Sequence, residues 1–199
     1  MWTKKLGDRY RTRYPSLSFK KKQRIMDLVL KKHFQVVQPP HFLFNCLSQI
    51  EPCCVVELGG YDGTQALDIL ESYPNTSWVN YDISATVTDI TRSELEEYNY
   101  RLVILKKPFP EYDLGNFDLF YTSKTLEHMS LDEVLETLSA TRKAKYQVHI
   151  IDWWWKDDTH VIERGKHDAI IRHLEALGYT MRTVVKRKLQ SRIFCSRDE

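Results

Sequence analysis

The sequence predicts an α/β fold in which a doubly wound, mostly parallel sheet ends in an antiparallel hairpin. Short apolar runs alternate along the chain with segments of helical periodicity, which is the pattern of strands and crossover helices in a parallel sheet. The last two β-like segments, 180–186 and 192–196, are joined by a short linker and should therefore pair with each other. The length of 199 residues suffices for one compact domain with its own core.

The first 50 residues are expected to form a basic helical cap beside the sheet. Residues 18–34 carry apolar side chains at helical spacing, and Pro39-Pro40 is expected to stop that helix. A second short helix is expected over 42–50, ended by Pro52. The catalytic part is expected over 51–199.

From residue 53 onward, strands and helices are expected to alternate. Cys53–Leu58 is a continuous apolar run, as expected of a strand that is buried on both faces. Thr91–Glu94 and Ser130–Glu133 fit capping boxes that open helices, and Gly178 stands where a helix should end. The further strands are expected at 77–83, 101–105, 117–122 and 147–153, and the helices at 64–73, 91–98, 130–142 and 166–177.

Composition argues against several classes of protein. No apolar run approaches the roughly 18 residues of a membrane span. Charged residues follow the N-terminal methionine closely, so a signal peptide is not expected. The four cysteines have no zinc-site spacing, and we expect them to be reduced thiols of a cytoplasmic protein. The net charge of +2 gives no global sign of a polyanion-binding protein.

The glycine distribution points to a ligand site. Of only seven glycines, Gly59, Gly60 and Gly63 lie close together, between a strand and a helix, where doubly wound sheets bind ligands. Their spacing fits neither the G-x-G-x-x-G dinucleotide fingerprint nor a phosphate-binding P-loop. Glu57 and Asp62 add carboxylates that would repel a pyrophosphate and suit a cation. S-adenosylmethionine (SAM), which carries a sulfonium and an ammonium group and no phosphate, is therefore the favoured ligand.

A further acid supports a nucleoside ligand. Asp82 ends the next predicted strand, close to the distance from Gly59 at which a doubly wound site places an acid on the ribose hydroxyls. A carboxylate can accept hydrogen bonds from both hydroxyls. The flanking Tyr81 and Ile83 are expected to sandwich the adenine.

Taken together, these motifs resemble the class I SAM-dependent methyltransferase family, over roughly residues 50–199. The family's E-x-G-x-x-x-G pattern is matched by Glu57, Gly59 and Gly63, and its ribose-binding acid by Asp82. The segment Phe117–Met129 is similar to the family's fourth strand and the turn that follows. The resemblance implies a seven-stranded Rossmann-like methyltransferase fold and S-adenosyl-L-methionine as the cofactor.

The resemblance also implies roles for individual residues. His128 and Asp152 would face the methyl acceptor, and the imidazole would be able to take a proton from an attacking hydroxyl or amine. Ser123 would lie near the amino-acid moiety of the cofactor. The other cofactor-binding residues would be Glu57, Gly59, Gly60, Tyr61, Gly63, Asp82 and Ile83.

Three functions stay open on these residues. The first is methyl transfer to a hydroxyl of a small-molecule or sugar-like acceptor, because no Asn/Asp-Pro-Pro-Tyr segment of the kind that marks amino-group methylation of bases follows the fourth strand. The second is an RNA methyltransferase or nucleic-acid binder, because residues 1–35 hold eleven Lys/Arg and only two acids. The third is a non-catalytic binding subunit, because Tyr61 replaces a frequent glycine of the family and Lys106-Lys107 a frequent acid.

Two further features are interpreted structurally. Trp153-Trp154-Trp155 is expected to form a hydrophobic lid against the N-terminal helices, with a substrate-stacking pocket as the alternative. His160, Glu163 and His167 are interrupted by basic residues and are expected on a solvated loop rather than around a metal ion.

Overall fold

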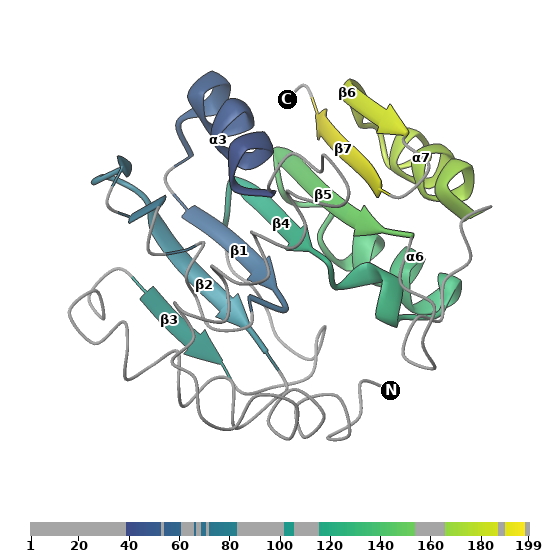
Figure 1. Ribbon diagram of the computed structural model, residues 1–199, viewed down its shortest axis with the longest axis horizontal. Coiled ribbons are helices and arrows are strands. Elements are labelled where there is room, and N and C mark those ends of the chain that lie inside the picture. The colour runs from purple at the N-terminus through teal and green to yellow at the C-terminus, as the bar shows by residue number, and fades with distance from the viewer. Residues whose placement is uncertain are drawn as a thin grey trace, which may run out of the picture.

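A single mixed sheet forms the centre of the protein (Figure 1). The computed structural model describes residues 39–52, 54–60, 66, 69–70, 72–82, 102–105, 116–153, 166–186 and 190–197. Within these residues the strand order is β3-β2-β1-β4-β5-β7-β6. The strands are β1 (Cys54–Leu58), β2 (Ser77–Tyr81), β3 (Leu102–Leu105), β4 (Leu119–Ser123), β5 (Tyr146–Asp152), β6 (Thr180–Lys186) and β7 (Gln190–Ser196).

The strand directions confirm the predicted α/β class. The first five strands pair in parallel, whereas β7 runs antiparallel to both β5 and β6. The chain winds outward from β1 through β2 to β3 and then returns to β4 on the other side of β1. The crevice between the carboxyl ends of β1 and β4 is therefore the topological switch point, where open α/β sheets bind ligands.

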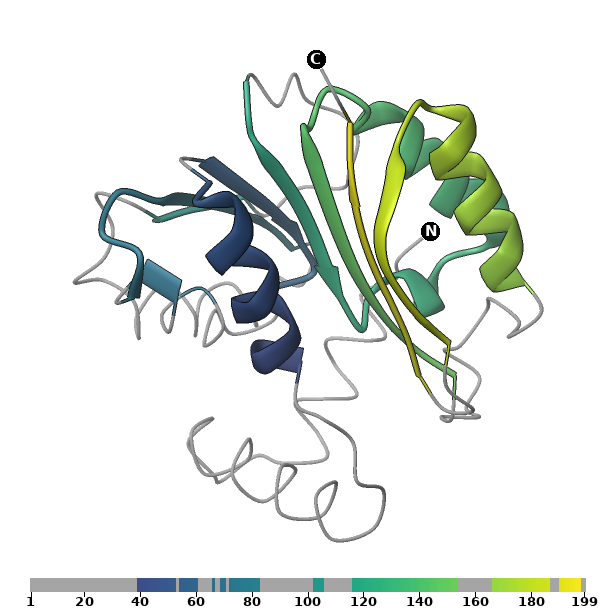
Figure 2. The same cartoon turned by 90° about the horizontal axis from the view of Figure 1, so that it is seen from above.

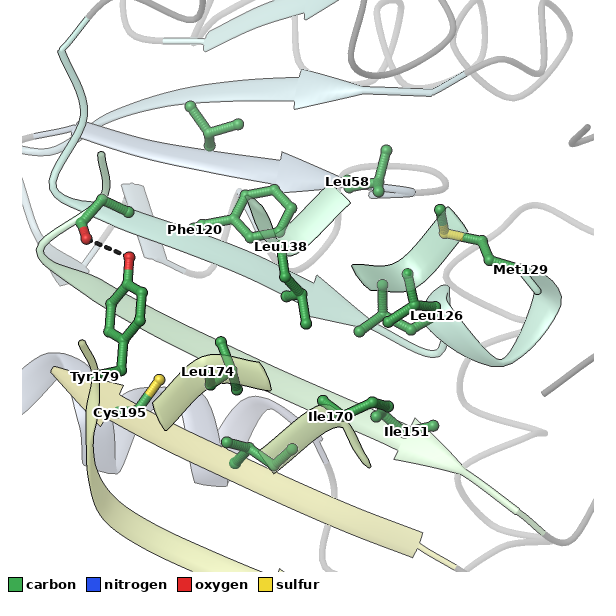
Figure 3. Close-up of a cluster of buried hydrophobic side chains, with 14 of the residues drawn as sticks. Leu58, Phe120, Leu126, Met129, Leu138, Ile151, Ile170, Leu174, Tyr179 and Cys195 are labelled. Atoms are coloured by element: carbon green, nitrogen blue, oxygen red, sulfur yellow. Dashed lines mark hydrogen bonds between the residues drawn. The ribbon is translucent and has the colours of Figure 1, made fainter. Parts of the chain in front are cut away.

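Helices cover both faces of the sheet (Figure 2). Helix α3 (Pro39–Ile50) lies on one face, and α6 (Leu131–Ala140) and α7 (His167–Ala176) lie on the other. The core on the α3 side includes Leu43 and Leu47 of the helix and Trp78 of β2. The core on the α6/α7 side is drawn in Figure 3 and includes Leu138 and Leu174 of the two helices.

The helix boundaries follow the expected signals with one correction. Ser130 forms the predicted capping box, in which its hydroxyl accepts from the Glu133 backbone N–H (3.3 Å) and the Glu133 carboxylate accepts from the Ser130 N–H (2.8 Å). Pro39-Pro40 begins α3 instead of only ending an earlier helix, because proline is tolerated in the first helical turn. The helices expected at 18–34 and 91–98, and part of the one at 64–73, lie outside the described residues.

A polar chain crosses the core on the α6/α7 side. The Tyr179 hydroxyl donates to the Ala144 carbonyl (2.6 Å, Figure 3) and accepts from the Gln147 side-chain amide (2.9 Å). The Gln147 carbonyl oxygen then accepts from His149 Nε2 (2.9 Å), which leaves His149 Nδ1 to accept from the Thr122 hydroxyl (2.9 Å). Burial lowers the pKa of His149 to about 3. His149 is therefore a neutral, fully bonded core residue.

Two expectations about the C-terminal half are corrected. The Trp153 ring packs against the core on the α6/α7 side, and its Nε1 donates to the Ser191 hydroxyl (2.6 Å). The described N-terminal helix, α3, covers the opposite face, so Trp153 is not a lid against it. His167 is a buried residue at the start of α7 rather than part of a solvated loop. Trp154, Trp155, His160 and Glu163 lie outside the described residues.

Three further checks concern metals, membranes and thiols. Within the described ranges, no group of three or more His, Cys, Asp or Glu is placed to hold a metal ion. No helix in the part of the chain that the structure describes is long and apolar enough to span a bilayer. Cys46, Cys54 and Cys195 are free thiols, as expected, and Cys53 is not among the described residues.

Candidate functional site

Polar side chains gather where the strands end on the α3 side of the sheet. Glu57 of β1 is aligned with Asn80 of β2 and with Tyr121 of β4. Successive side chains of a strand alternate between the two faces. Asp82 and Ser123, two positions further along their strands, therefore belong to the same face as this row. The result is a polar edge at the switch point, above the apolar core that α3 covers.

The turn after β1 requires glycine at its first position. Gly59 has φ of +74°, a conformation that side chains other than glycine rarely adopt. A Cβ at this position would also collide with the Thr125 side chain. The Gly59 N–H donates to the Tyr81 carbonyl (2.7 Å), and the Thr125 hydroxyl donates to the Leu58 carbonyl (3.0 Å). These contacts tie the β1 turn to β2 on one side and to the β4 turn on the other.

Gly60 lies in close contact with two polar side chains. Its N–H donates to Asn80 Oδ1 (3.0 Å), and a Cβ at Gly60 would lie 2.5 Å from both Asn80 Nδ2 and Glu57 Oε2. Asn80 Nδ2 is buried and has no hydrogen-bond partner. A buried donor without a partner is uncommon in native proteins and calls for an explanation, of which a bound ligand is one. Sequence reasoning missed Asn80, although an amide inside a buried strand was a usable signal.

Glu57 is a buried acid beside this contact. Its side chain is 2% exposed, and its Oε2 accepts from the Trp78 indole N–H (2.9 Å). Burial raises the pKa of Glu57 to about 8, the Trp78 hydrogen bond opposes that rise, and the nearby Asp82 adds to it. The carboxyl group therefore holds a proton at neutral pH. A cation bound beside it would favour its ionised form.

Asp82 immediately follows β2 and is 5% exposed. Its predecessor Tyr81 packs in the core on the α6/α7 side, opposite the polar edge. The expectation that Tyr81 stacks on an adenine is therefore wrong. Its proposed partner Ile83, and the predicted cofactor residues Tyr61 and Gly63, lie outside the described residues.

The turn after β4 carries a strained lysine. Ser123 is the last residue of β4 and is half-buried, as the prediction of a site residue at this edge requires. Lys124 follows with φ of +54°, and its backbone N–H donates to the Ile150 carbonyl (2.8 Å). A non-glycine residue in this conformation is uncommon, and such strain concentrates at functional sites. Its ammonium lies 3.6 Å from Asp152 Oδ2.

Asp152 ends β5 and is 6% exposed. Its Oδ1 accepts from the Gln190 side-chain amide (2.8 Å), and Gln190 Oε1 accepts in turn from Arg192 Nε (2.7 Å). The Arg192 guanidinium carbon lies 5.7 Å from the centre of the Phe42 ring of α3. Asp152 is thus held from β7 on one side and by Lys124 on the other, at the edge that the sequence predicted for it.

The short 3-10 helix η2 (Leu126–His128) brings two side chains to this region. His128, predicted as an acceptor-side residue, is half-buried, and its backbone N–H donates to the Thr125 carbonyl (3.1 Å). Its neighbour Glu127, which was not predicted, is 1% exposed. Glu127 Oε1 accepts from the Asp152 backbone N–H (3.4 Å), whereas Oε2 is buried and has no hydrogen-bond partner.

The charges along this edge favour a cationic ligand. Four carboxyl groups are nearly completely buried here, those of Glu57, Asp82, Glu127 and Asp152. The described cationic side chains near them are those of Lys124 and Arg192, both on the β4–β5–β7 side. Burial raises the pKa of Glu127 well above its usual range, and Asp152 adds to the rise. The β1–β2 half of the edge therefore suits a positively charged nucleoside better than a phosphate.

Comparison with known proteins identifies the fold. No protein-family model matches the sequence, and no curated protein matches it significantly. Many solved structures do match. The methyltransferase domain of bacterial CtHen1-C has a TM-score of 0.68 and 10% identity over 81% of this chain and 98% of that domain. Magnesium protoporphyrin IX methyltransferase (ChlM) from Synechocystis PCC 6803, solved with bound SAM, has a TM-score of 0.64 and 12% identity over 80% and 76%.

Larger methyltransferases match over part of their length. Human N-acetylserotonin methyltransferase, in complex with SAM, has a TM-score of 0.62 and 11% identity over 80% of this chain and 52% of that one. The chain likewise spans about half of the pyocyanin biosynthetic protein PhzM. These likenesses establish that the chain has the fold of the class I SAM-dependent methyltransferases.

Proposed function

We propose that the protein is a SAM-dependent methyltransferase that methylates a hydroxyl group of a small-molecule or sugar-like acceptor. The observation that carries this proposal is the contact at Gly60, where a buried amide donor without a partner and a buried carboxyl group meet the backbone at the switch point. The fold supports it, because SAM is bound in the ChlM and N-acetylserotonin methyltransferase structures, as their descriptions state.

The residues at the β1–β2 end fit this cofactor. Gly59 and Gly60 let the backbone approach a ligand closely, and Asn80 Nδ2 is available to donate a hydrogen bond to it. Glu57 would balance a positive charge, and Asp82 would accept from the ribose hydroxyls. Bound SAM would supply an electrophilic methyl group on a cationic sulfur.

The β4–β5 end would serve the acceptor. Ser123, His128 and Asp152 would surround the group to be methylated, and the contacts of Asp152 with Gln190 and Lys124 would keep its carboxylate in one position. Holding the acceptor oxygen in line with the methyl group supplies much of the acceleration of such a displacement. The hydroxyl proton must leave as the new bond forms, and a positioned carboxylate or imidazole is suited to accept it.

Isothermal titration calorimetry with SAM and with its demethylated product, S-adenosylhomocysteine (SAH), tests the proposal. We expect the wild-type protein to bind SAM with a micromolar-range Kd. Asp82→Asn should weaken binding by about 1.5–3 kcal/mol, the value of hydrogen bonds to a charged acceptor. Glu175→Gln changes an exposed acid on α7 and should leave the affinity unchanged. If folded wild-type protein binds neither compound, the methyltransferase proposal fails and the non-catalytic subunit becomes the better account.

The alternative acceptor is a nucleic acid. The observation that favours it is the excess of Lys/Arg over acids in residues 1–35, which lie outside the described residues. RNA affinity should then fall steeply with salt, because bound basic side chains release counterions from the phosphates. Deleting residues 1–24 should abolish that affinity, and RNA affinity that survives the deletion unchanged would remove this segment as the binding site.

A further inference from the structure

We propose that Glu127 is a further catalytic residue, whose carboxylate receives the proton that the acceptor hydroxyl loses during methyl transfer. This inference rests on the proposed function, because it concerns the same edge of the sheet. It assigns a definite role to a side chain that neither the glycine cluster nor the ribose-binding acid involves.

The stagger of two strands places Glu127 at the acceptor end of the site. β4 ends at Ser123, which is paired with Ile150, whereas β5 continues to Asp152. The Asp152 backbone N–H consequently has no strand partner on the β4 side and donates to Glu127 Oε1 instead (3.4 Å). The Glu127 carboxyl group is thereby fixed beside Asp152, at the carboxyl ends of both strands.

Capping the ladder uses only one of the two carboxyl oxygens. Glu127 Oε2 is buried and has no partner, and an unpaired buried polar atom destabilises the folded protein. A purely structural cap would be served equally well by glutamine, whose amide oxygen also accepts. The second oxygen therefore points to a group that arrives with a ligand, and a hydroxyl proton is such a group.

The surroundings distinguish Glu127 from Asp152 as the proton acceptor. Both Asp152 oxygens have protein partners, since Gln190 donates to Oδ1 and the Lys124 ammonium lies near Oδ2. Glu127 Oε2 has none. Burial raises the pKa of Glu127 first, the charge of Asp152 raises it further, and Lys124 lowers it. A carboxylate with a raised pKa is a stronger base than an exposed one.

The other groups around Glu127 act through Asp152 or are adjacent in sequence. Arg192 of β7 reaches Asp152 through Gln190, and His128 is the next residue of η2. Glu133 of α6 has its carboxylate engaged by the Ser130 N–H. The described charges that bear on Glu127 directly are thus one carboxylate and one ammonium.

The step balances in atoms and charge. A lone pair of the acceptor oxygen forms the new C–O bond as the methyl–sulfur bond breaks, and the electrons of that bond stay on sulfur. The hydroxyl proton moves to Glu127 Oε2, and the electrons of the O–H bond stay on the acceptor oxygen. The positive charge of the sulfonium and the negative charge of the carboxylate disappear together, so the step ends with a neutral carboxyl group, which is the form that burial favours.

The first test needs no acceptor. In protein with 13C-labelled glutamate side chains, the carboxyl resonance that is missing from Glu127→Gln identifies Glu127. We expect it to titrate well above an ordinary glutamate in the free protein. Saturating SAM should move the midpoint to lower pH than saturating SAH, because SAM alone carries the sulfonium charge. A Glu127 resonance that titrates like an exposed glutamate, or that responds equally to SAM and SAH, would overturn the proposal.

The second test uses turnover. [Methyl-3H]SAM and a panel of hydroxyl compounds identify a working acceptor. Glu127→Gln keeps the oxygen that caps Asp152 and should lower kcat by roughly 10²- to 10⁴-fold, with the acidic limb of the pH profile lost and SAM affinity by calorimetry unchanged. Glu127→Asp should restore part of the rate. Wild-type kcat and pH profile in Glu127→Gln would reduce Glu127 to a strand cap, whereas failure of the wild-type protein to bind SAM would instead refute the proposed function.

Discussion

Replacing Glu57 by glutamine should stabilise the cofactor-free protein and weaken the cofactor complex. The carboxyl group is 2% exposed and has a pKa of about 8, whereas the same group in the unfolded chain has its ordinary value of 4.5. Between these two values the folded state keeps a proton that the unfolded state has lost. Rising pH therefore favours unfolding in this window.

The size of the effect follows from the shift. Each pH unit between about 4.5 and 8 costs the wild-type protein about 1.4 kcal/mol of unfolding free energy. At pH 7 the accumulated cost is roughly 3 kcal/mol. Glutamine has nearly the shape of the protonated acid, can still accept from the Trp78 indole, and carries no titrating proton. Glu57→Gln should therefore match the wild type near pH 4.5 and exceed it increasingly above that.

Urea unfolding at pH 5, 7 and 8.5 measures this difference. The buried His149 titrates in both proteins, so its effect on stability cancels in the comparison. Glu175→Gln, an exposed change on α7, should show no pH-dependent difference from the wild type. A stability difference between Glu57→Gln and the wild type that stays constant from pH 5 to 8.5 would refute the reasoning.

The same substitution should affect SAM in the opposite direction. A bound cation favours ionised Glu57, so wild-type affinity for SAM should increase with pH between 6 and 8. Glu57→Gln should bind SAM more weakly and lose most of that pH dependence.

Two further predictions concern the fold. Gly59→Ala should lower the free energy of unfolding by at least about 1–2 kcal/mol, because φ is +74° and the new Cβ would meet the Thr125 side chain; urea unfolding measures this, and wild-type stability would contradict it. His149 is held neutral with a pKa of about 3, so the folded state binds fewer protons than the unfolded state below pH 6.5. Wild-type stability should accordingly fall by about 1.4 kcal/mol per pH unit as pH drops from 6.5 toward 3, and His149→Gln should flatten this slope relative to the wild type; equal slopes in the two proteins would exclude His149 as the cause.

The parts of the fold that depend on local sequence were predictable. The apolar run before Gly59 and the capping box at Ser130 are local signals, and the structure contains a strand and a helix start at those places. Strand alternation also brings Glu57 and Asp82 to one face. The seven strands of the described sheet follow the order expected when a doubly wound sheet ends in a hairpin.

The parts that depend on how strands end relative to one another were not predictable. Glu127 is buried because β4 stops before β5 does, and a single sequence does not contain that stagger. The positive φ of Lys124 is likewise a product of the turn that follows. Trp153 was assigned to the wrong face because its sequence does not indicate that Ser191 of β7 holds its indole N–H.

Mapping SAH binding by NMR tests the central claim most directly. The claim is that the cofactor lies against the backbone of Gly59 and Gly60 and beside the Asn80 side-chain amide. Saturable shifts of these three N–H signals, with no shift of the Ala176 amide at the end of α7, are the predicted result. Binding that leaves the signals of Gly59, Gly60 and Asn80 unchanged, or the absence of any binding to the folded protein, would contradict it.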